Sequence, residues 1–195
     1  HLKNNFMRTK ISGCLLFVGF FLCANSQPLK NDKNVFEFRG VWIATVENID
    51  YPSKRGLSNE AQKQEFIDLL DRHQQNGMNA IIMQIRPAGD ALYPSALEPW
   101  SEYLMGKQGQ APIPFYDPLV FMIEETHKRG MEFHAWINPY RAVFNINKSS
   151  VTPSHLSKMH PEWFINFEGK KYFNPGLPEV WNHTNKVVAD ILKRY

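Results

Sequence analysis

Polar and aromatic side chains gather where apolar stretches of this 195-residue chain end, and these residues could form a binding site. In the stretch 79–85, side chains alternate between two faces near its end, so that Gln84 and Arg86 share a face with Ile82. Buried polar groups cost free energy unless they are paired, so an inward-pointing amide and guanidinium predict a site. The residues expected to contact a ligand are Trp42, Gln84, Arg86, Asp90, Tyr93, His134, Trp136, Asn138, Tyr140 and Arg141.

Each of these residues also has a purely structural interpretation. Arg86 could cap neighbouring backbone carbonyls, and Asp90 could cap its own loop. Trp42 and Trp136 lie within strands and could simply fill a packed interior. Among the acids near strand ends, which are Glu47, Asp50 and Asp90, the last is the candidate supporting acid because it shares a loop with Gly89 and Arg86.

Three predicted strands position these side chains. They cover residues 35–46, 79–85 and 132–138, and the middle one is almost continuously apolar, as expected for a parallel strand covered on both faces. Three helices follow the strands. One begins near Ser58 or Asn59 and ends at Gly77, one runs from the N-cap Asp117 to Gly130, and one runs from 178 to the end of the chain.

The loops that follow the strands are long, and the loops that lead into strands are short. A connection of about 35 residues follows Arg141, and within it 163–167 and 171–173 could pair as a hairpin. This asymmetry is typical of an α/β protein with the (β/α)8 TIM-barrel fold, whose sites lie at the carboxyl ends of the strands. Because a complete barrel needs about 250 residues, we expect only the first half in this chain. A doubly wound open sheet is the alternative, although no Gly-x-Gly-x-x-Gly follows the first strand.

Residues 1–26 read as upstream residues followed by a secretory signal peptide, 27–34 as a linker, and 35–195 as the barrel portion. A basic segment at 7–10 precedes the apolar run 11–24, which is short for a membrane span. We therefore expect an exported protein of the periplasm, cell envelope or extracellular space. Both cysteines, Cys14 and Cys23, lie in the predicted signal segment. Lipidation of Cys23 is the one membrane attachment that remains open.

Several classes of function are disfavoured. The net charge is only +3, and no run of Lys and Arg with interleaved aromatics occurs, so a nucleic-acid partner is not expected. His155, His160 and Glu162 do not have a spacing typical of zinc sites, and we expect neither a metal nor another cofactor.

Three segments, 38–46, 84–95 and 134–141, together resemble the glycosyl-hydrolase-like family ten, and the likeness extends over most of 35–195. The resemblance implies a TIM-barrel glycosidase that acts on cell-wall glycan, with some members cleaving peptidoglycan strands that lack stem peptides. It also implies that an acidic pair ends the strand beyond Tyr195, where the main catalytic acid is expected. The aromatic residues would then stack on sugar rings.

Two functions remain open at this point. One is a secreted glycoside hydrolase of cell-wall glycan, and the other is a noncatalytic glycan-binding barrel or an inactive fragment. The arginines bear on the substrate, because a guanidinium can bind a carboxylate through two parallel hydrogen bonds. Arg86 and Arg141 are therefore expected to recognise the lactyl carboxylate of muramic acid, whereas Arg39 is expected to pair structurally with a barrel carboxylate. The alternative is a structural role for all three.

Overall fold

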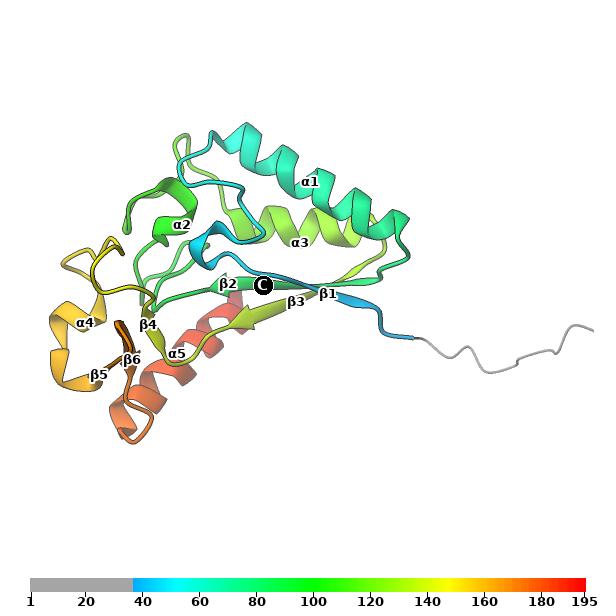
Figure 1. Cartoon of the computed structure of the whole chain (residues 1–195). Helices are drawn as coiled ribbons and strands as arrows, with labels where there is room; N and C mark the ends of the chain where they lie inside the picture. The colour runs from blue at the N-terminus through cyan, green and yellow to red at the C-terminus, as the bar shows by residue number, and fades with distance from the viewer. Residues whose placement is uncertain (1–36) are drawn as a thin grey trace, which may run out of the picture. The chain divides into compact units, whose positions relative to one another are not determined.

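The computed structural model describes residues 37–195, so the predicted signal peptide and linker lie outside the described residues. Three parallel strands form the main sheet in the order β1-β2-β3 (Figure 1). They are β1 (Gly40–Ile43), β2 (Ala80–Arg86) and β3 (Glu132–Ile137). The first is shorter than predicted, because the chain turns into the short 3-10 helix η1 (Val46–Asn48) instead of continuing as a strand.

Three helices follow the strands as predicted. They are α1 (Asn59–Gln75), α3 (Pro118–Lys128) and α5 (Pro178–Arg194). Ser58 caps α1 by accepting a hydrogen bond from the backbone of Ala61, and Asp117 caps α3 through the next two free backbone N–H groups. Both predicted N-caps are confirmed. The alternation of strand and helix is therefore that of an α/β protein with a parallel sheet.

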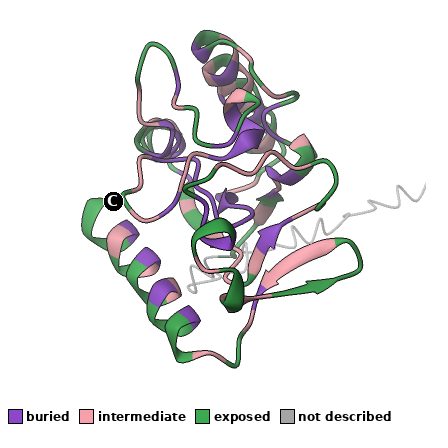
Figure 2. Ribbon diagram, turned by 90° about the vertical axis from the view of Figure 1, so that its left-hand side faces the viewer, coloured by how far each residue is buried: buried purple, intermediate pink, exposed green. Residues whose placement is uncertain are grey.

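One face of the main sheet carries the hydrophobic core. Side chains in register across parallel strands point to the same face, and here Ile43, Met83 and Ile81 turn toward the helices. Helix residues pack against them, namely Phe66, Leu69, Leu70, Leu119, Met122, Val187 and Ile191. Figure 2 shows this buried centre in purple. Burial of this apolar surface is the main force that fixes the helices on the sheet.

The opposite face of the main sheet carries larger and more polar side chains. Trp42, Ile82 and His134 are in register on it, followed by Gln84 and Trp136. Trp42 is 61% exposed, so this face is open to solvent over β1. Within residues 37–195, β1 and β3 each have a main-sheet partner on one side only. The sheet described here is thus open rather than closed into a barrel.

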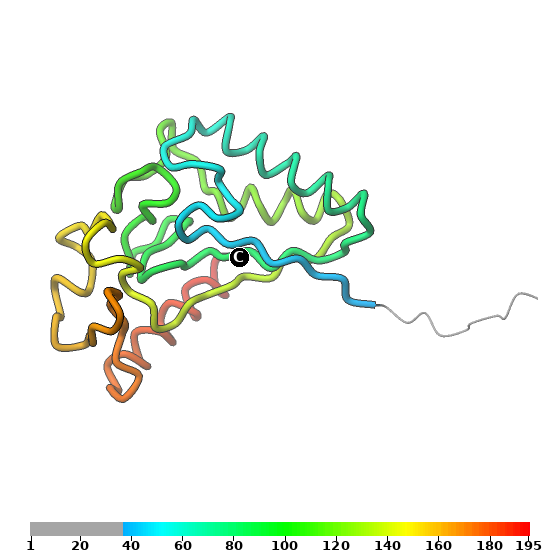
Figure 3. Tube along the Cα trace, in the orientation of Figure 1, coloured from blue at the N-terminus to red at the C-terminus, as the bar shows by residue number. Residues whose placement is uncertain are grey.

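A second, smaller sheet lies beyond the carboxyl ends of β2 and β3 (Figures 1 and 3). It is antiparallel, with order β4-β6-β5, and consists of β4 (Arg141–Val143), β5 (Phe164–Phe167) and β6 (Lys170–Phe173). The predicted hairpin is confirmed by the pairing of β5 with β6. The third strand, β4, was not predicted, because a three-residue strand carries too little alternation to be recognised.

Short helices complete the long loops. Helix α2 (Glu102–Met105) follows β2, while α4 (Leu156–Met159) and η2 (Pro161–Trp163) lie between β4 and β5. None of the helices in residues 37–195 combines the length and apolar character needed to cross a bilayer.

Candidate functional site

The end of β2 is joined to the end of β1 by the side chain of Gln84. Its Oε1 accepts hydrogen bonds from the backbone N–H groups of Thr45 and Val46, both at 2.9 Å. Two backbone donors fix which end of the amide is the oxygen, so the Nε2 must point the other way. That Nε2 is buried and has no partner among the described residues. Gln84 therefore links the ends of β1 and β2, and its Nε2 is a buried donor without an acceptor among the described residues.

Arg86 lies at the centre of a buried charged network. Its Nε donates to Glu98 Oε2 at 2.7 Å, and its Nη2 donates to the other oxygen of the same carboxylate. The third nitrogen, Nη1, donates to the backbone carbonyl of Asn138 at the end of β3. Both side chains of the ion pair have no exposed surface. The two-pronged contact is the geometry in which a guanidinium binds a carboxylate most strongly.

His183 of α5 completes the network by contacting Glu98 Oε1 through Nε2 at 2.9 Å. Burial alone would raise the pKa of Glu98, but the charge of Arg86 and the hydrogen bonds from His183 and Arg86 outweigh it and lower the pKa to about 2. The carboxylate is therefore ionised at neutral pH. It connects β2, the following loop and α5.

This geometry corrects the expected partner of Arg86. A substrate carboxylate was predicted, whereas the guanidinium is fully buried and its three nitrogens already contact Glu98 and the carbonyl of Asn138. The alternative role of Arg86, capping of backbone carbonyls, is realised in part, because one of its contacts is to the carbonyl of Asn138. Arg39 also differs from prediction, because its ion pair is with the exposed Glu37 rather than with a carboxylate of the interior.

Asp90 lies in the loop after β2 and is also buried. Its Oδ1 accepts from the backbone N–H of Ala88 at 3.1 Å, and its Oδ2 accepts from Gln108 Nε2 at 3.0 Å. Burial raises the pKa of Asp90 to about 6, although these two hydrogen bonds act in the opposite direction. The bond to Ala88 is the loop cap that sequence allowed as the alternative. In this structure the carboxyl has no exposed surface to offer a substrate.

Glu47 is an accessible acid at the end of β1. Its side chain is 40% exposed, and its Oε1 is held by Arg55 Nη2 at 3.2 Å and by the hydroxyl of Tyr103 at 3.3 Å. Glu47 and Asn48 both have positive φ, at 54° and 55°. Such strain in non-glycine residues is concentrated at functional sites. Asp50 is also exposed, and its Oδ2 accepts a hydrogen bond from the backbone N–H of Ala44.

The predicted aromatic residues fall into different environments. Trp42 and Trp136 contact each other edge to face, with ring centroids 5.0 Å apart, on the open face of the main sheet. Tyr140 is 40% exposed just beyond β3. Tyr93 is buried with its hydroxyl unpaired and its ring against Tyr195, so it offers no face to a sugar here.

The remaining predicted residues belong to β3 and β4. His134 is 45% exposed at its side chain and contacts Glu132 at 2.9 Å. Asn138 Nδ2 and Arg141 Nη1 are buried atoms without a hydrogen-bond partner in the described residues. With Gln84 Nε2, three unused donors therefore lie at or just beyond the ends of β2 and β3.

Two members of the network, Glu98 and His183, were not predicted from the sequence. Glu98 lies in an irregular loop, and nothing in its spacing from Arg86 indicates contact. His183 had a detectable signal, because it falls between Val180 and Val187 on the buried stripe of α5. A titratable residue on an apolar helix face needs a polar partner.

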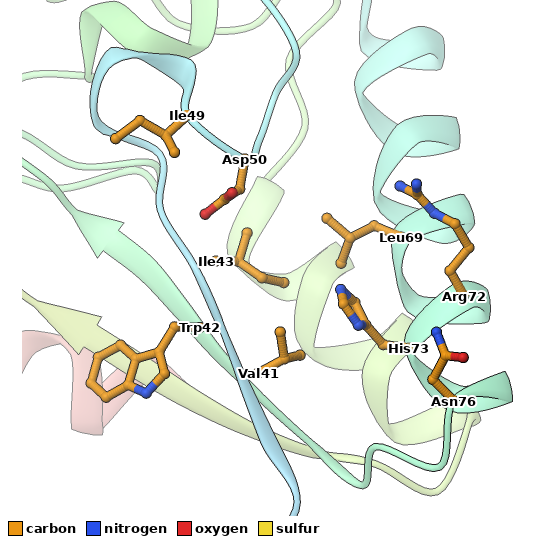
Figure 4. A pocket seen from close by; sticks show the side chains of 9 residues that line it. All are labelled: Val41, Trp42, Ile43, Ile49, Asp50, Leu69, Arg72, His73 and Asn76. Atoms are coloured by element: carbon orange, nitrogen blue, oxygen red, sulfur yellow. The ribbon is translucent and has the colours of Figure 1, made fainter.

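A cavity of about 430 Å³ lies elsewhere, between the free edge of β1 and α1. Figure 4 shows Val41 and Ile43 turned toward Leu69 and His73, whereas Trp42 points to the other side. The cavity is thus an uncovered part of the core layer, distinct from the strand-end network. Among residues 37–195, no group of three or more His, Cys, Asp or Glu side chains could hold a metal ion.

Comparison with known proteins gives a consistent group of relatives. A family model described as "Glycosyl hydrolase-like 10" matches residues 37–195. Glycosyl hydrolase YngK of Bacillus subtilis (strain 168) is 50% identical over 182 residues, which is 92% of this chain and 35% of the relative. Glycosyl hydrolase DigH of Escherichia coli (strain K12) is 36% identical over 184 residues, covering 86% of this chain and 42% of the relative. The chain thus spans less than half the length of these relatives.

Two solved structures have partial likeness to the chain. The galactosidase domain of the alpha-galactosidase-sucrose kinase AgaSK matches with a TM-score of 0.48 and 19% identity, covering 83% of this chain and 20% of that one. An alpha-amylase from Lactobacillus plantarum matches with a TM-score of 0.43 and 16% identity, covering 79% of this chain and 34% of that one.

Proposed function

Because the chain belongs to the glycosyl hydrolase-like 10 family, we propose that it forms part of an exported glycoside hydrolase of bacterial cell-wall glycan. The substrate in this proposal is peptidoglycan from which the stem peptides have been removed. The observation that carries the proposal is the 50% identity, over 92% of this chain, to a relative named as a glycosyl hydrolase. Export rests on the signal-like residues 7–26, which lie outside the described part.

The proposed architecture is a (β/α)8 barrel. The repeating unit of that fold is a parallel strand followed by a helix. The structure contains three such units in sequential order, with their helices packed on one face of the sheet. The site then lies at the carboxyl ends of the strands, where Gln84, Asn138 and Arg141 carry unused donors. Closure of the barrel would also give β1 and β3 their second neighbours.

The chemistry requires two carboxyl groups on either side of the glycosidic bond, about 5–5.5 Å apart for retention or roughly 6.5–9.5 Å apart for inversion. Among the acids at the strand ends, Glu47 and Asp50 are accessible, while Asp90 and Glu98 are buried and hydrogen-bonded internally. The main catalytic acid is expected on the strand that follows Tyr195. The proposal assigns Glu47, which follows β1, to contact with the substrate.

One observation favours a second candidate, a noncatalytic glycan-binding barrel. Asp90 and Glu98, the two acids with strongly shifted pKa values, are both used to hold loops together. A noncatalytic glycan-binding protein needs rigid loops of this kind but does not need an acidic side chain that is free to react. The sequence beyond Tyr195 separates the two candidates, because a hydrolase requires an acidic residue at the end of the next strand.

The experiment that tests the proposed function uses the full gene product on three substrates: denuded peptidoglycan strands, intact sacculi and chitin oligomers. New reducing ends are counted over time. The hydrolase proposal expects release from denuded strands and much less from intact sacculi. Binding to denuded strands without new reducing ends would instead support the noncatalytic barrel.

A further inference from the structure

We propose that the outward face of the small β4-β6-β5 sheet binds the carboxylate groups of a glycan strand, with Arg141 and Lys170 as the recognising cations. The proposal rests on the proposed function for the glycan nature of the ligand, but it concerns binding and not hydrolysis. We call the surface the cation–aromatic face. Its members are Arg141, Phe144, Ile165, Phe167, Lys170 and Tyr172.

The strand register builds this face. Tyr172 is paired with Arg141 on one side and with Ile165 on the other, so three side chains stand next to each other across the three strands. The register shifts between Arg141 and Val143. Because of this irregularity, Val143 lies on the opposite face of the sheet together with Lys171, whereas Arg141 lies on the same face as Tyr172.

The same face continues toward the hairpin turn. Phe167 is paired with Lys170, two residues along from Ile165 and Tyr172. Phe167 is 61% exposed and Ile165 is 48% exposed, so apolar surface is open to solvent here. Figure 2 shows the hairpin ribbon mostly in the colours of exposed and intermediate residues. The opposite side of the sheet is closed, since Phe173 packs into a core with Leu156.

One aromatic ring connects the two cations. Arg141 Cζ lies 5.5 Å from the centroid of the Phe144 ring, and Lys170 Nζ lies 5.6 Å from the same centroid. Both distances are within the range of a cation–π contact. Both positive charges of the face therefore lie close to the same flat ring.

These two charges have no anionic partner in the structure. No salt bridge of residues 37–195 includes Arg141 or Lys170. Arg141 Nη1 is in addition buried without a hydrogen-bond partner, which costs free energy until an acceptor is supplied. The cation–aromatic face itself contains no acid. An anionic ligand would complement it.

The combination of groups indicates the kind of anion. Flat aromatic side chains bind the apolar faces of rings while their neighbours bind polar substituents. Two cations suit separate carboxylates better than a nucleic-acid backbone, which is bound by extended runs of positive charge. The sheet also lies beyond the carboxyl ends of β2 and β3 (Figure 1), at the end of the main sheet where the proposed site lies. A glycan whose sugars carry carboxylate substituents fits these conditions.

The test measures binding of the full gene product to denuded peptidoglycan strands and to the same strands after chemical reduction of their carboxylates to alcohols. Calorimetry gives the dissociation constant for wild type, Arg141→Gln, Lys170→Gln and the double variant. We expect the double variant to lose about tenfold or more in affinity for the carboxylate form, in line with the loss of hydrogen bonds to a charged group. Lys170→Arg keeps the charge and should keep most of the affinity.

Controls separate this effect from unfolding and from general charge. Lys148→Gln removes an exposed lysine outside the cation–aromatic face and should leave binding unchanged. The carboxyl-reduced strands should bind weakly and equally to wild type and variants. Equal losses on both glycans, unchanged binding in the double variant, or no binding by wild type would each overturn the proposal. If the protein binds the carboxylate form of the glycan but does not hydrolyse it, the proposed enzymatic function is overturned and the proposed binding site is not.

Discussion

Glu98 is the residue on which the strand-end network depends, because it neutralises Arg86 and receives His183 within the interior. A buried ion pair owes its stability to complete hydrogen bonding, and removal of one partner leaves a charge in a medium that solvates it poorly. Here both carboxylate oxygens are used, by Arg86 and His183. The role of the network is therefore to fix the loop after β2 against β3 and α5.

Replacement of Arg86 tests this role. Arg86→Met keeps the volume but leaves Glu98 with His183 alone, so the free energy of unfolding should fall by about 3–5 kcal/mol. Urea denaturation followed by tryptophan fluorescence measures the change. Lys128→Met, which removes an exposed ion pair with Glu125, is the matched control and should shift the midpoint little. Similar losses in the two variants would contradict a special role for the buried pair.

Asp90 makes a prediction about pH. Its folded-state pKa, about 6, lies above the ordinary value of 3.8, so the protonated form is favoured in the native protein. The stability that comes from this group is fully present below about pH 4 and is lost as the pH rises through 6. A shift of about two pKa units corresponds to roughly 3 kcal/mol.

An asparagine cannot ionise, so the Asp90→Asn variant should not show this decrease in stability between about pH 4 and 6. Unfolding free energies at several pH values across that window provide the measurement. Glu98 acts in the opposite direction only below its ordinary value of 4.5, because its pKa is lowered to about 2. An unchanged pH slope in the variant would show that Asp90 is ionised with an ordinary pKa.

At the level of single residues, sequence identified which residue types gather at strand ends but not their partners. Gln84 and Arg86 were predicted to share one face of β2, but the register of β2 with β3 shifts between them and pairs Arg86 with Ile137, so simple alternation does not extend to Arg86. The partner of Arg86 lies in an irregular loop, and its position depends on tertiary packing. An arginine in a buried strand has to find a carboxylate, and sequence cannot say whether that carboxylate is internal or belongs to a ligand.

The loop after β2 contacts the small sheet, and we call this contact the joint. Gly89 lies at this joint with φ of +63°, and a Cβ there would meet His155 Nε2 at 2.9 Å and the Phe173 ring at 3.2 Å. The buried ring of His155 also contacts the carbonyl of Ala88 at 3.3 Å. Only glycine satisfies both the backbone conformation and the close approach.

Gly89→Ala should therefore destabilise the protein more than Gly77→Ala does. Gly77 also has positive φ, at +78°, but a Cβ there would meet nothing within 4 Å. The backbone strain is common to both variants, at about 1–2 kcal/mol, and the clash adds about 1–3 kcal/mol at Gly89 alone. Thermal unfolding of the two variants side by side measures the difference, and equal melting temperatures would contradict the packing at the joint.

At the level of elements, the helices were the most predictable part. Their caps are local signals, and Ser58 and Asp117 begin helices as expected. The small sheet was predicted only as a hairpin, because β4 pairs with a strand almost 30 residues away and contains an irregularity at Ala142. Short strands of this kind are fixed by pairing and not by their own sequence.

Within residues 37–195, the open face and the free edges of the main sheet are the dominant large-scale feature. Trp42 and Phe38 expose 61% and 56% of their surface on or beside β1. Unpaired strand edges and exposed aromatics promote association between chains. The alternation of strands and helices predicted the parallel sheet, but sequence alone could not show how far the sheet is closed.

The 195-residue chain should therefore self-associate in a concentration-dependent way. Sedimentation velocity of wild type, Trp42→Glu and Phe115→Glu tests this expectation. Phe115 is 67% exposed in a loop away from the sheet edge, so its replacement is the control for added charge. Only Trp42→Glu should reduce association. A wild-type chain that sediments as a monomer at all concentrations would contradict the prediction.

The function that we propose for this chain is a contribution to the hydrolysis of glycosidic bonds in cell-wall glycan. The most direct measurement is mass spectrometry of denuded peptidoglycan strands after incubation with the full gene product in ¹⁸O-labelled water. Hydrolysis adds one water across each cleaved bond, so we predict products with one labelled oxygen at each new reducing end. Intact strands, or shorter strands without label, would contradict the proposed hydrolysis.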